Sequence, residues 1–209
     1  MPATDKTVLL STAYLPPVDY FLQLNSGAEI LIDRHCNYVK QTYRNRCVIA
    51  AANELQTISI PVVKPDSPKC PDCDVRISDH GAWRHLHWNA IASAYRSSPF
   101  FEYYEDDFRP FYEKKYEFLF DFNEELRILL CNLLDIAPKV AYTQSFIEKD
   151  DEHYLDLREA VNPKKPPVSA SFKPYYQVFE QKYGFQPNLS IIDLLFNMGN
   201  EAALFLNCN

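Results

Sequence analysis

Apolar residues follow two different spacings in the first part of the chain. Thr7–Tyr14 and Ala28–Asp33 are short β-type runs, whereas Tyr20, Phe21 and Leu24 between them recur at helical spacing. A strand, a helix and a second strand in this order favour parallel pairing of the two strands, because the helix carries the chain back across the sheet. The pattern therefore predicts the start of an α/β domain.

A second pair of β-type runs follows. Cys47–Ala50 and Leu55–Val62 are separated by a short polar segment, and Ile58, Ile60 and Val62 alternate onto one face of the second run. This arrangement predicts an antiparallel hairpin, so the N-terminal half is expected to contain both parallel and antiparallel strands.

Helical spacing governs most of the chain after this hairpin. One stripe begins at Trp83 after a cap at Ser78 or Asp79, and a second stripe follows a capping-box pattern at Asp121. Residues 100–120 are rich in Phe and Tyr and predict one or two short helices with aromatic side chains on the surface and in the core. A last helix is expected at residues 190–198, a strand at 140–147 and a loop at 162–174. We therefore predict one α/β domain over residues 1–209, with a mixed sheet in the N-terminal half and a helix-rich C-terminal half.

Composition adds limits on the class of protein. Hydrophobic residues make up 47% of the chain and aromatic residues 14%, which is enough to form a core and argues against disorder. The formal net charge of -7 predicts no nucleic acid partner, because such binding depends on Lys and Arg. No apolar run reaches the roughly 18 residues of a membrane span, and the N-terminus lacks a signal-type segment. We therefore expect a cytoplasmic protein with reduced cysteines.

Several short segments carry a resemblance to a known family. They include Tyr14-Leu15-Pro16, Asn37-Tyr38, Arg44-Asn45-Arg46, Pro187-Asn188-Leu189-Ser190 and Asp193-Leu194-Leu195-Phe196-Asn197, in this order along the chain. Together they resemble the WbqC-like family of bacterial glycan-locus proteins. The chain departs from the family where many members have Gln-Pro, since Ser11-Thr12-Ala13 stands there. The resemblance implies a role in surface polysaccharide synthesis, with aminoacyl (glycine) transfer to an amino sugar proposed for some members, and it supplies no catalytic residues.

The first candidate site lies where the two early strands end, because open α/β sheets bind ligands at the carboxyl ends of their strands. Tyr14, Asp33 and His35 are expected to meet there. A histidine beside a carboxylate suits general base chemistry, so Asp33 and His35 are the candidate catalytic residues. The alternative is that Asp33 caps a turn and His35 is only exposed.

The second candidate is the basic segment before the predicted hairpin. Arg44, Asn45 and Arg46 are candidates for binding the anionic part of a substrate, because a guanidinium grips phosphate or carboxylate with two parallel hydrogen bonds. The segment is equally compatible with a solvated strand entry. Tyr38 and Asn188, which lie in segments that carry the family resemblance, are assigned to the same substrate site.

The remaining candidates carry weaker signals. His87 lies on the apolar face of the helix that starts at Trp83, so it points inward and is either a pocket residue or a core residue. Cys70 and Cys73 form a single C-x-x-C, and a zinc site would need two further ligands. With 4 Gly and no P-loop or dinucleotide fingerprint, no cofactor and no metal are predicted.

Two functions remain open on these observations. The first is a metal-independent transferase that passes an aminoacyl or acyl group to an amino sugar in surface polysaccharide synthesis. The second is a non-catalytic module that binds a nucleotide-sugar or a partner enzyme of the same pathway, using the aromatic segment near residues 100–120. The expected partners are thus a sugar or nucleotide-sugar and, beyond it, a second copy of the chain or another enzyme of the pathway.

Overall fold

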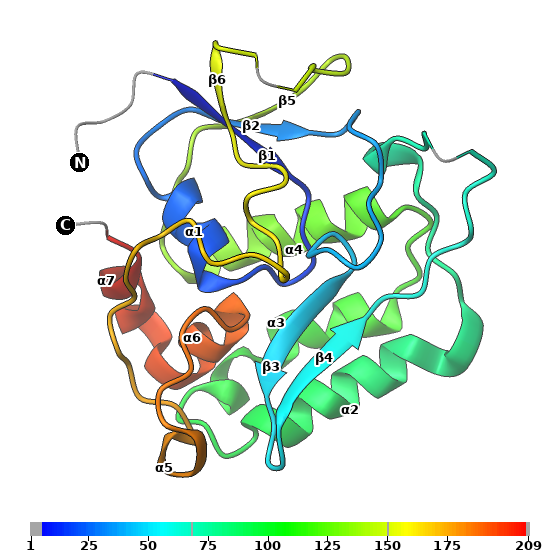
Figure 1. Cartoon of the computed structure of the whole chain (residues 1–209). Helices are drawn as coiled ribbons and strands as arrows, with labels where there is room; N and C mark the ends of the chain where they lie inside the picture. The colour runs from blue at the N-terminus through cyan, green and yellow to red at the C-terminus, as the bar shows by residue number, and fades with distance from the viewer. Residues whose placement is uncertain (1–5, 68, 150, 208–209) are drawn as a thin grey trace.

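The larger of two sheets contains four parallel strands, seen in a computed structural model that describes residues 6–67, 69–149 and 151–207 (Figure 1). The strand order is β5-β2-β1-β6. The strands are β1 (Thr7–Ser11), β2 (Ile30–Asp33), β5 (Val140–Tyr142) and β6 (Tyr154–Asp156). Leu9 and Leu10 on β1 are both fully buried, because the central strand of a parallel sheet is covered on both faces. The predicted parallel pairing of β1 and β2 is confirmed.

The smaller sheet is the predicted hairpin. It consists of β3 (Arg46–Ala50) and β4 (Leu55–Ser59), which pair antiparallel. The α/β class with parallel and antiparallel strands is therefore confirmed, and the two kinds of pairing belong to separate sheets.

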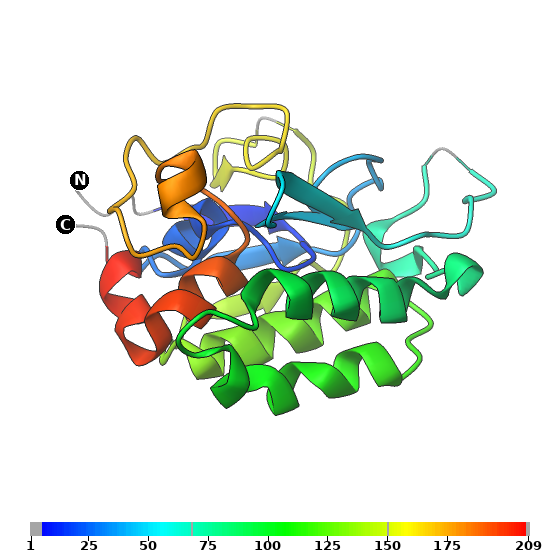
Figure 2. The same ribbon diagram turned by 90° about the horizontal axis from the view of Figure 1, so that it is seen from below.

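Seven α-helices lie in the described ranges, together with three short 3₁₀ turns. They are α1 (Val18–Leu24), η1 (Asp72–Asp74), η2 (His80–Ala82), α2 (Trp83–Tyr95), α3 (Phe101–Glu113), α4 (Leu119–Leu133), α5 (Glu180–Tyr183), α6 (Ile191–Met198), η3 (Gly199–Ala202) and α7 (Ala203–Leu206). Figure 2 shows α2, α3 and α4 as a helical layer on one side of both sheets. Among these described helices, none is long and apolar enough to cross a membrane.

The aromatic segment after residue 100 lies mostly in the core. Phe101, Tyr104 and Phe108 on α3 are buried, and their rings pack around Phe196 of α6. Tyr103 remains 74% exposed. The prediction that this segment places rings both on the surface and in the core is confirmed, and few rings remain for a binding surface, because helical spacing turns one aromatic face toward α6.

The predicted helix caps at residues 78–79 and 121 are wrong. Between Ser78 and α2, Gly81 and Ala82 take positive φ angles and interrupt the helical backbone, so α2 begins at Trp83. The next helix, α4, begins at Leu119 because this buried residue packs in the core and its N–H bonds the carbonyl of Val75. Tertiary contacts override the local capping signals in both places.

Candidate functional site

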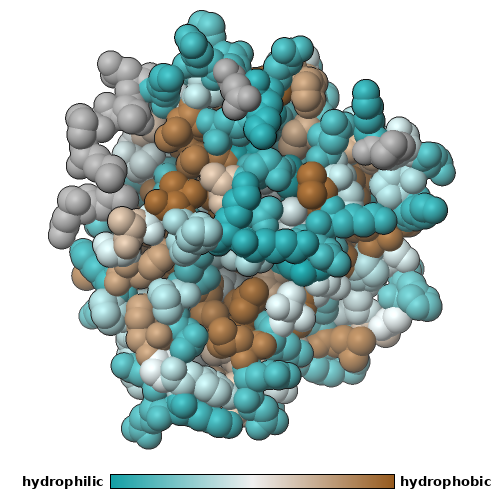
Figure 3. Space-filling view, viewed as in Figure 1, coloured by the Kyte–Doolittle hydropathy of each residue, from teal (hydrophilic) through white to brown (hydrophobic). Residues whose placement is uncertain are grey.

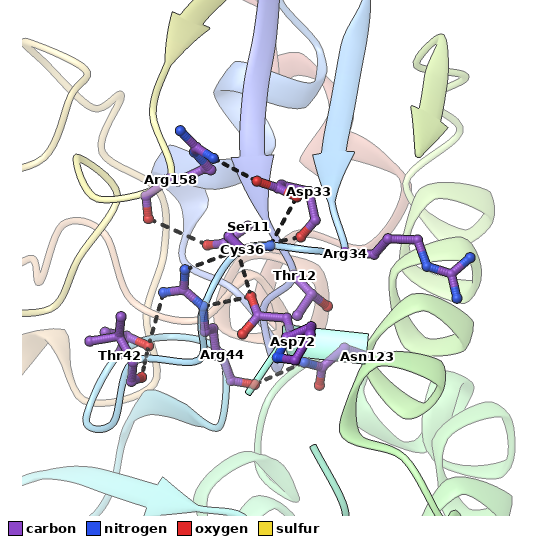
Figure 4. Close-up of polar contacts among 12 residues, drawn as sticks. Ser11, Thr12, Asp33, Arg34, Cys36, Thr42, Arg44, Asp72, Asn123 and Arg158 are labelled. Atoms are coloured by element: carbon purple, nitrogen blue, oxygen red, sulfur yellow. Dashed lines mark hydrogen bonds and ion pairs between the residues drawn. The ribbon is translucent and has the colours of Figure 1, made fainter. Parts of the chain in front are cut away.

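Polar side chains gather where the four parallel strands end. Ser11 is the last residue of β1, Asp33 of β2 and Asp156 of β6, and Thr143 follows β5. Figure 4 shows Ser11 and Asp33 beside Arg158 at these strand ends. We call this region the carboxyl edge, and it is where parallel α/β sheets bind ligands.

Arg158 connects the carboxyl edge through two ion pairs. Its Nη1 lies 2.6 Å from Asp33 Oδ2, and its Nη2 lies 2.6 Å from Asp156 Oδ2. The same guanidinium donates to the carbonyl oxygens of Ile147 and Glu148. Because these bonds occupy the guanidinium, Arg158 acts as a clamp on β2, β6 and the segment between β5 and β6.

Asp33 is fully buried and holds the turn after β2. Its Oδ1 accepts hydrogen bonds from the N–H groups of His35 and Cys36 at 2.9 and 3.0 Å, and from the hydroxyl of Thr143 at 3.0 Å. Because Arg158 donates to Oδ2, four donors in all contact the two oxygens of this carboxylate, and its contacts are taken up by the protein itself. The structure therefore replaces the catalytic assignment of Asp33 with the alternative role as a turn cap and positioning residue.

A second buried ion pair lies beside this turn. Arg44 Nε is 2.7 Å from Asp72 Oδ2, and both side chains are at most 2% exposed. The thiol of Cys36 donates to the same Asp72 oxygen at 3.0 Å. Burial, followed by the charge of Asp72, raises the pKa of this thiol, so Cys36 stays protonated. Arg44 therefore acts as a buried support, and we do not retain it as a direct substrate ligand.

The Cys70–Cys73 segment supports residues 34–38 through the main chain. Tyr38 N–H bonds the carbonyl of Cys70, Asp72 N–H that of Cys36, and Cys73 N–H that of Arg34. Within the described ranges, no three His, Cys, Asp or Glu side chains are grouped so that they could hold a metal ion.

A third buried ion pair ties the carboxyl edge to α4. Thr12 donates its hydroxyl to Glu124 Oε1 at 3.3 Å, and Arg127 Nε lies 2.7 Å from Glu124 Oε2. The hydroxyl of Tyr142 on β5 also donates to this oxygen, at 3.1 Å. The ends of β1 and β5 are thus fixed against the helical layer.

Tyr14 and His87 lie together in the core, away from Asp33. The hydroxyl of Tyr14 is 2.9 Å from His87 Nδ1 and 2.9 Å from the hydroxyl of Tyr112. Burial lowers the pKa of His87 to about 4, so the imidazole is neutral. The predicted meeting of Tyr14 with Asp33 and His35 is wrong, because the tyrosine ring turns into the space between α2 and α3.

The two predicted asparagines have local structural partners. Asn45 Nδ2 donates to the carbonyl of Ile60 at 2.9 Å, which holds the base of the hairpin. Asn188 takes a positive φ of 60° and accepts the N–H of Asp19 at the start of α1. Asn45 Oδ1 is buried without a hydrogen-bond partner, but an amide oxygen only accepts hydrogen bonds and would not bind an anion, so neither asparagine is a candidate for binding a phosphate.

Three predicted residues keep polar groups free for a ligand. Within the described part of the chain, Arg46 Nε is buried without a hydrogen-bond partner, and the structure shows no hydrogen bond to the His35 ring or the Tyr38 hydroxyl. Tyr38 lies within the electrostatic influence of Arg44, Arg46 and Asp72. Burial and then Asp72 raise its pKa to about 12, so its hydroxyl can donate at neutral pH. His35, Tyr38 and Arg46 are therefore the candidate ligand-binding groups.

Sequence reasoning missed the side chains that support these groups. Arg158 and Asp72 find their partners far along the chain, and β6 beside Arg158 is too short for a periodic pattern. Asp72 lies in the C-x-x-C segment, a pattern that is typical of metal ligands and gives no signal of a buried ion pair. The Asp156-x-Arg158 spacing directly after a strand is the one local signal of the clamp.

Comparison with known proteins shows which family the sequence matches. The sequence matches the WbqC-like protein family over residues 12–166, which confirms the resemblance. It is also similar to the uncharacterised protein Rv1507c of Mycobacterium tuberculosis, at 26% identity, with 96% of this chain and 97% of the relative covered. No solved structure matches the chain. The family match includes His35, Tyr38 and Arg46.

Proposed function

Because this chain belongs to the WbqC-like protein family, we propose that it is a transferase of bacterial surface polysaccharide synthesis that binds a nucleotide-sugar at the carboxyl edge. The transferred group is an aminoacyl or acyl group, and the acceptor is an amino sugar. Residues 12–166, over which the family matches, contain the ends of β2, β5 and β6, the clamp and the three candidate ligand-binding residues.

The buried donor of Arg46 is the observation that carries this proposal. In the described residues, two buried side-chain N–H donors have no hydrogen-bond partner, those of Arg46 and Trp83. Such a group loses its hydrogen bonds to water without gaining others, and only that of Arg46 belongs to a cation. A phosphate oxygen would satisfy it with a charge-assisted bond. Tyr38 would donate a further hydrogen bond to the same anion, since its raised pKa keeps the hydroxyl protonated.

His35 is the proposed proton acceptor. Its backbone N–H is fixed by Asp33, which in turn is held by Arg158, so the ring is presented from a defined turn. The nitrogen of the amino sugar would attack the acyl carbon of an activated donor, an acyl phosphate or an ester. The bond from that carbon to the donor oxygen would then break, the oxygen would leave with the electron pair, and the His35 ring would take the proton that the nitrogen loses. Asp33 positions the turn that carries His35.

Isothermal titration calorimetry with UDP-, GDP- and dTDP-linked sugars tests the binding step. We expect at least one to bind the wild type, and Arg46→Gln to weaken its binding about tenfold or more, as for loss of a charge-assisted contact. Arg76→Gln is the matched control, because Arg76 pairs with Glu117 on the surface. Failure of every nucleotide-sugar to bind the wild type would overturn the proposal.

The saturated carboxylate of Asp33 favours a second candidate, a binding module without catalysis. Because Asp33 is a positioning residue, His35 is the one candidate base among the predicted catalytic residues. His35→Gln separates the two functions. For a transferase, this variant retains nucleotide-sugar binding and loses turnover. For a binding module, the wild type and the His35→Gln variant bind the nucleotide-sugar equally well, and the wild type shows no turnover with any aminoacyl or acyl donor.

A further inference from the structure

The segment 162–168, which we call the strap, is fixed at its C-terminal end. The carboxylate of Asp19 on α1 is 1% exposed and accepts the N–H groups of Val168 and Ser169 at 2.8 and 2.9 Å. Gln23 on the same helix also bonds the hydroxyl of Ser169. Two backbone bonds to one buried carboxylate hold this end of the strap against α1.

The N-terminal end of the strap is also fixed. Val161 directly before it is buried, and its N–H bonds the carbonyl of Leu157. Three prolines, Pro163, Pro166 and Pro167, restrict the backbone between the two ends. The strap therefore loses little conformational entropy when a ligand binds against it.

Lys164 projects from this strap to the loop that precedes β3. Its backbone N–H bonds the side chain of Asn162, which shapes the turn, and its Nζ lies 3.0 Å from Gln41 Oε1. Figure 3 shows a band of hydrophilic residues across the middle of this face, where the strap approaches the 38–46 loop in Figure 1. Lys164 thus reaches the loop that carries Tyr38 and leads into Arg46.

Of the cations around this loop, Arg44 is paired with carboxylates, whereas Arg46 and Lys164 are not. Arg44 faces Asp72 and, at 3.7 Å, the partly exposed carboxylate of Glu159. Over the described ranges, neither Arg46 nor Lys164 has a carboxylate within ion-pair distance, and Lys164 contacts only a neutral amide. An anion can therefore displace Gln41 from Lys164 without breaking an ion pair.

We propose that Lys164 is a second anion-binding residue beside the loop that precedes β3 and that, together with Arg46, it binds a diphosphate group. This inference rests on the proposed function and names the part of the substrate that the site recognises. A diphosphate presents separate negative groups to two cations from different segments, whereas a monoanionic carboxylate presents one. The strap holds the ammonium group of Lys164 beside Gln41 before a ligand binds.

Calorimetric titration with inorganic pyrophosphate tests the inference directly. We expect pyrophosphate to bind the wild type more tightly than inorganic phosphate does. Lys164→Gln should weaken pyrophosphate binding about tenfold, the effect of one charge-assisted contact. Lys165→Gln removes the same charge from the neighbouring exposed position and should change binding less than about threefold, as expected for screened surface charge.

The outcomes separate the two proposals. Equal pyrophosphate affinities of the Lys164→Gln and Lys165→Gln variants would overturn the role of Lys164, even if nucleotide-sugars bind through Arg46. Lys164-dependent binding of pyrophosphate without binding of any nucleotide-sugar would support the diphosphate site and overturn the proposed substrate. Absence of pyrophosphate binding to the wild type would overturn the inference.

Discussion

Arg158 Nη1 lies 2.6 Å from the buried Asp33 Oδ2, although the two residues are 125 positions apart in the sequence. This contact joins the ends of β2 and β6 on either side of the central strand β1. The turn that carries His35 therefore depends on a residue from the far side of the sheet.

Removal of this clamp should lower stability strongly. Arg158→Ala leaves the carboxylates of Asp33 and Asp156 without their cation, and loss of one partner of a buried pair costs about 3 to 5 kcal/mol. Urea denaturation of the wild type and the Arg158→Ala variant measures this difference in the free energy of unfolding. Arg109→Ala is the control, because the pair of Arg109 with Glu113 is exposed and its loss should cost less than about 1 kcal/mol. Equal losses in the two variants would contradict a structural role for the clamp.

Stability should fall on acidification because of His87. Its pKa is about 4 in the folded chain against the ordinary 6.5, so the unfolded chain binds the proton first as the pH falls. The stabilisation is complete above pH 6.5 and decreases between pH 6.5 and 4. The free energy of unfolding should therefore fall by about 2 kcal/mol between pH 7.5 and pH 5. The wild type should show this loss in chemical denaturation.

His87→Gln should remove that part of the pH dependence. Glutamine can still accept the hydroxyl proton of Tyr14 but does not titrate. The same substitution at the exposed His85 is the control and should keep the wild-type slope. A His87→Gln variant with an unchanged slope would show that another group accounts for the acid sensitivity.

Gly199, which ends α6, should tolerate no side chain. It has a φ of 56°, and a Cβ there would lie 2.6 Å from the ring of Phe100. We expect Gly199→Ala to destabilise the fold by about 3 kcal/mol, from backbone strain and overpacking together. Gly184 also has a positive φ but has open space at the Cβ position, so Gly184→Ala should cost about 1 kcal/mol. A smaller effect at position 199 than at 184 in thermal or urea unfolding would contradict this account.

The sequence predicts the elements whose signals are local. The β1-α1-β2 unit, the hairpin and α6 with Gly199 at its end all follow from periodicity and turn residues. The strand β6 has three residues and no recognisable period, so it could not be predicted. The caps of α2 and α4 depend on backbone turns and core contacts that local sequence does not encode.

The sequence predicts where the candidate site lies, but it predicts only some of the residues that form it. Because ligands bind at the carboxyl ends of parallel strands, the sequence predicts a site near Asp33 and His35. Residue type could not show that Asp33 and Arg44 have buried ionic partners, whereas Arg46 keeps an unpaired donor. Such differences arise from side chains that meet only after folding.

A crystal structure of the wild type with a bound nucleotide-sugar tests the central claim most directly. We expect the ligand at the carboxyl edge, with a phosphate oxygen within hydrogen-bond distance of the Arg46 guanidinium and the Tyr38 hydroxyl. A ligand bound elsewhere on the molecule, with Arg46 and Tyr38 free of contact, would contradict the account.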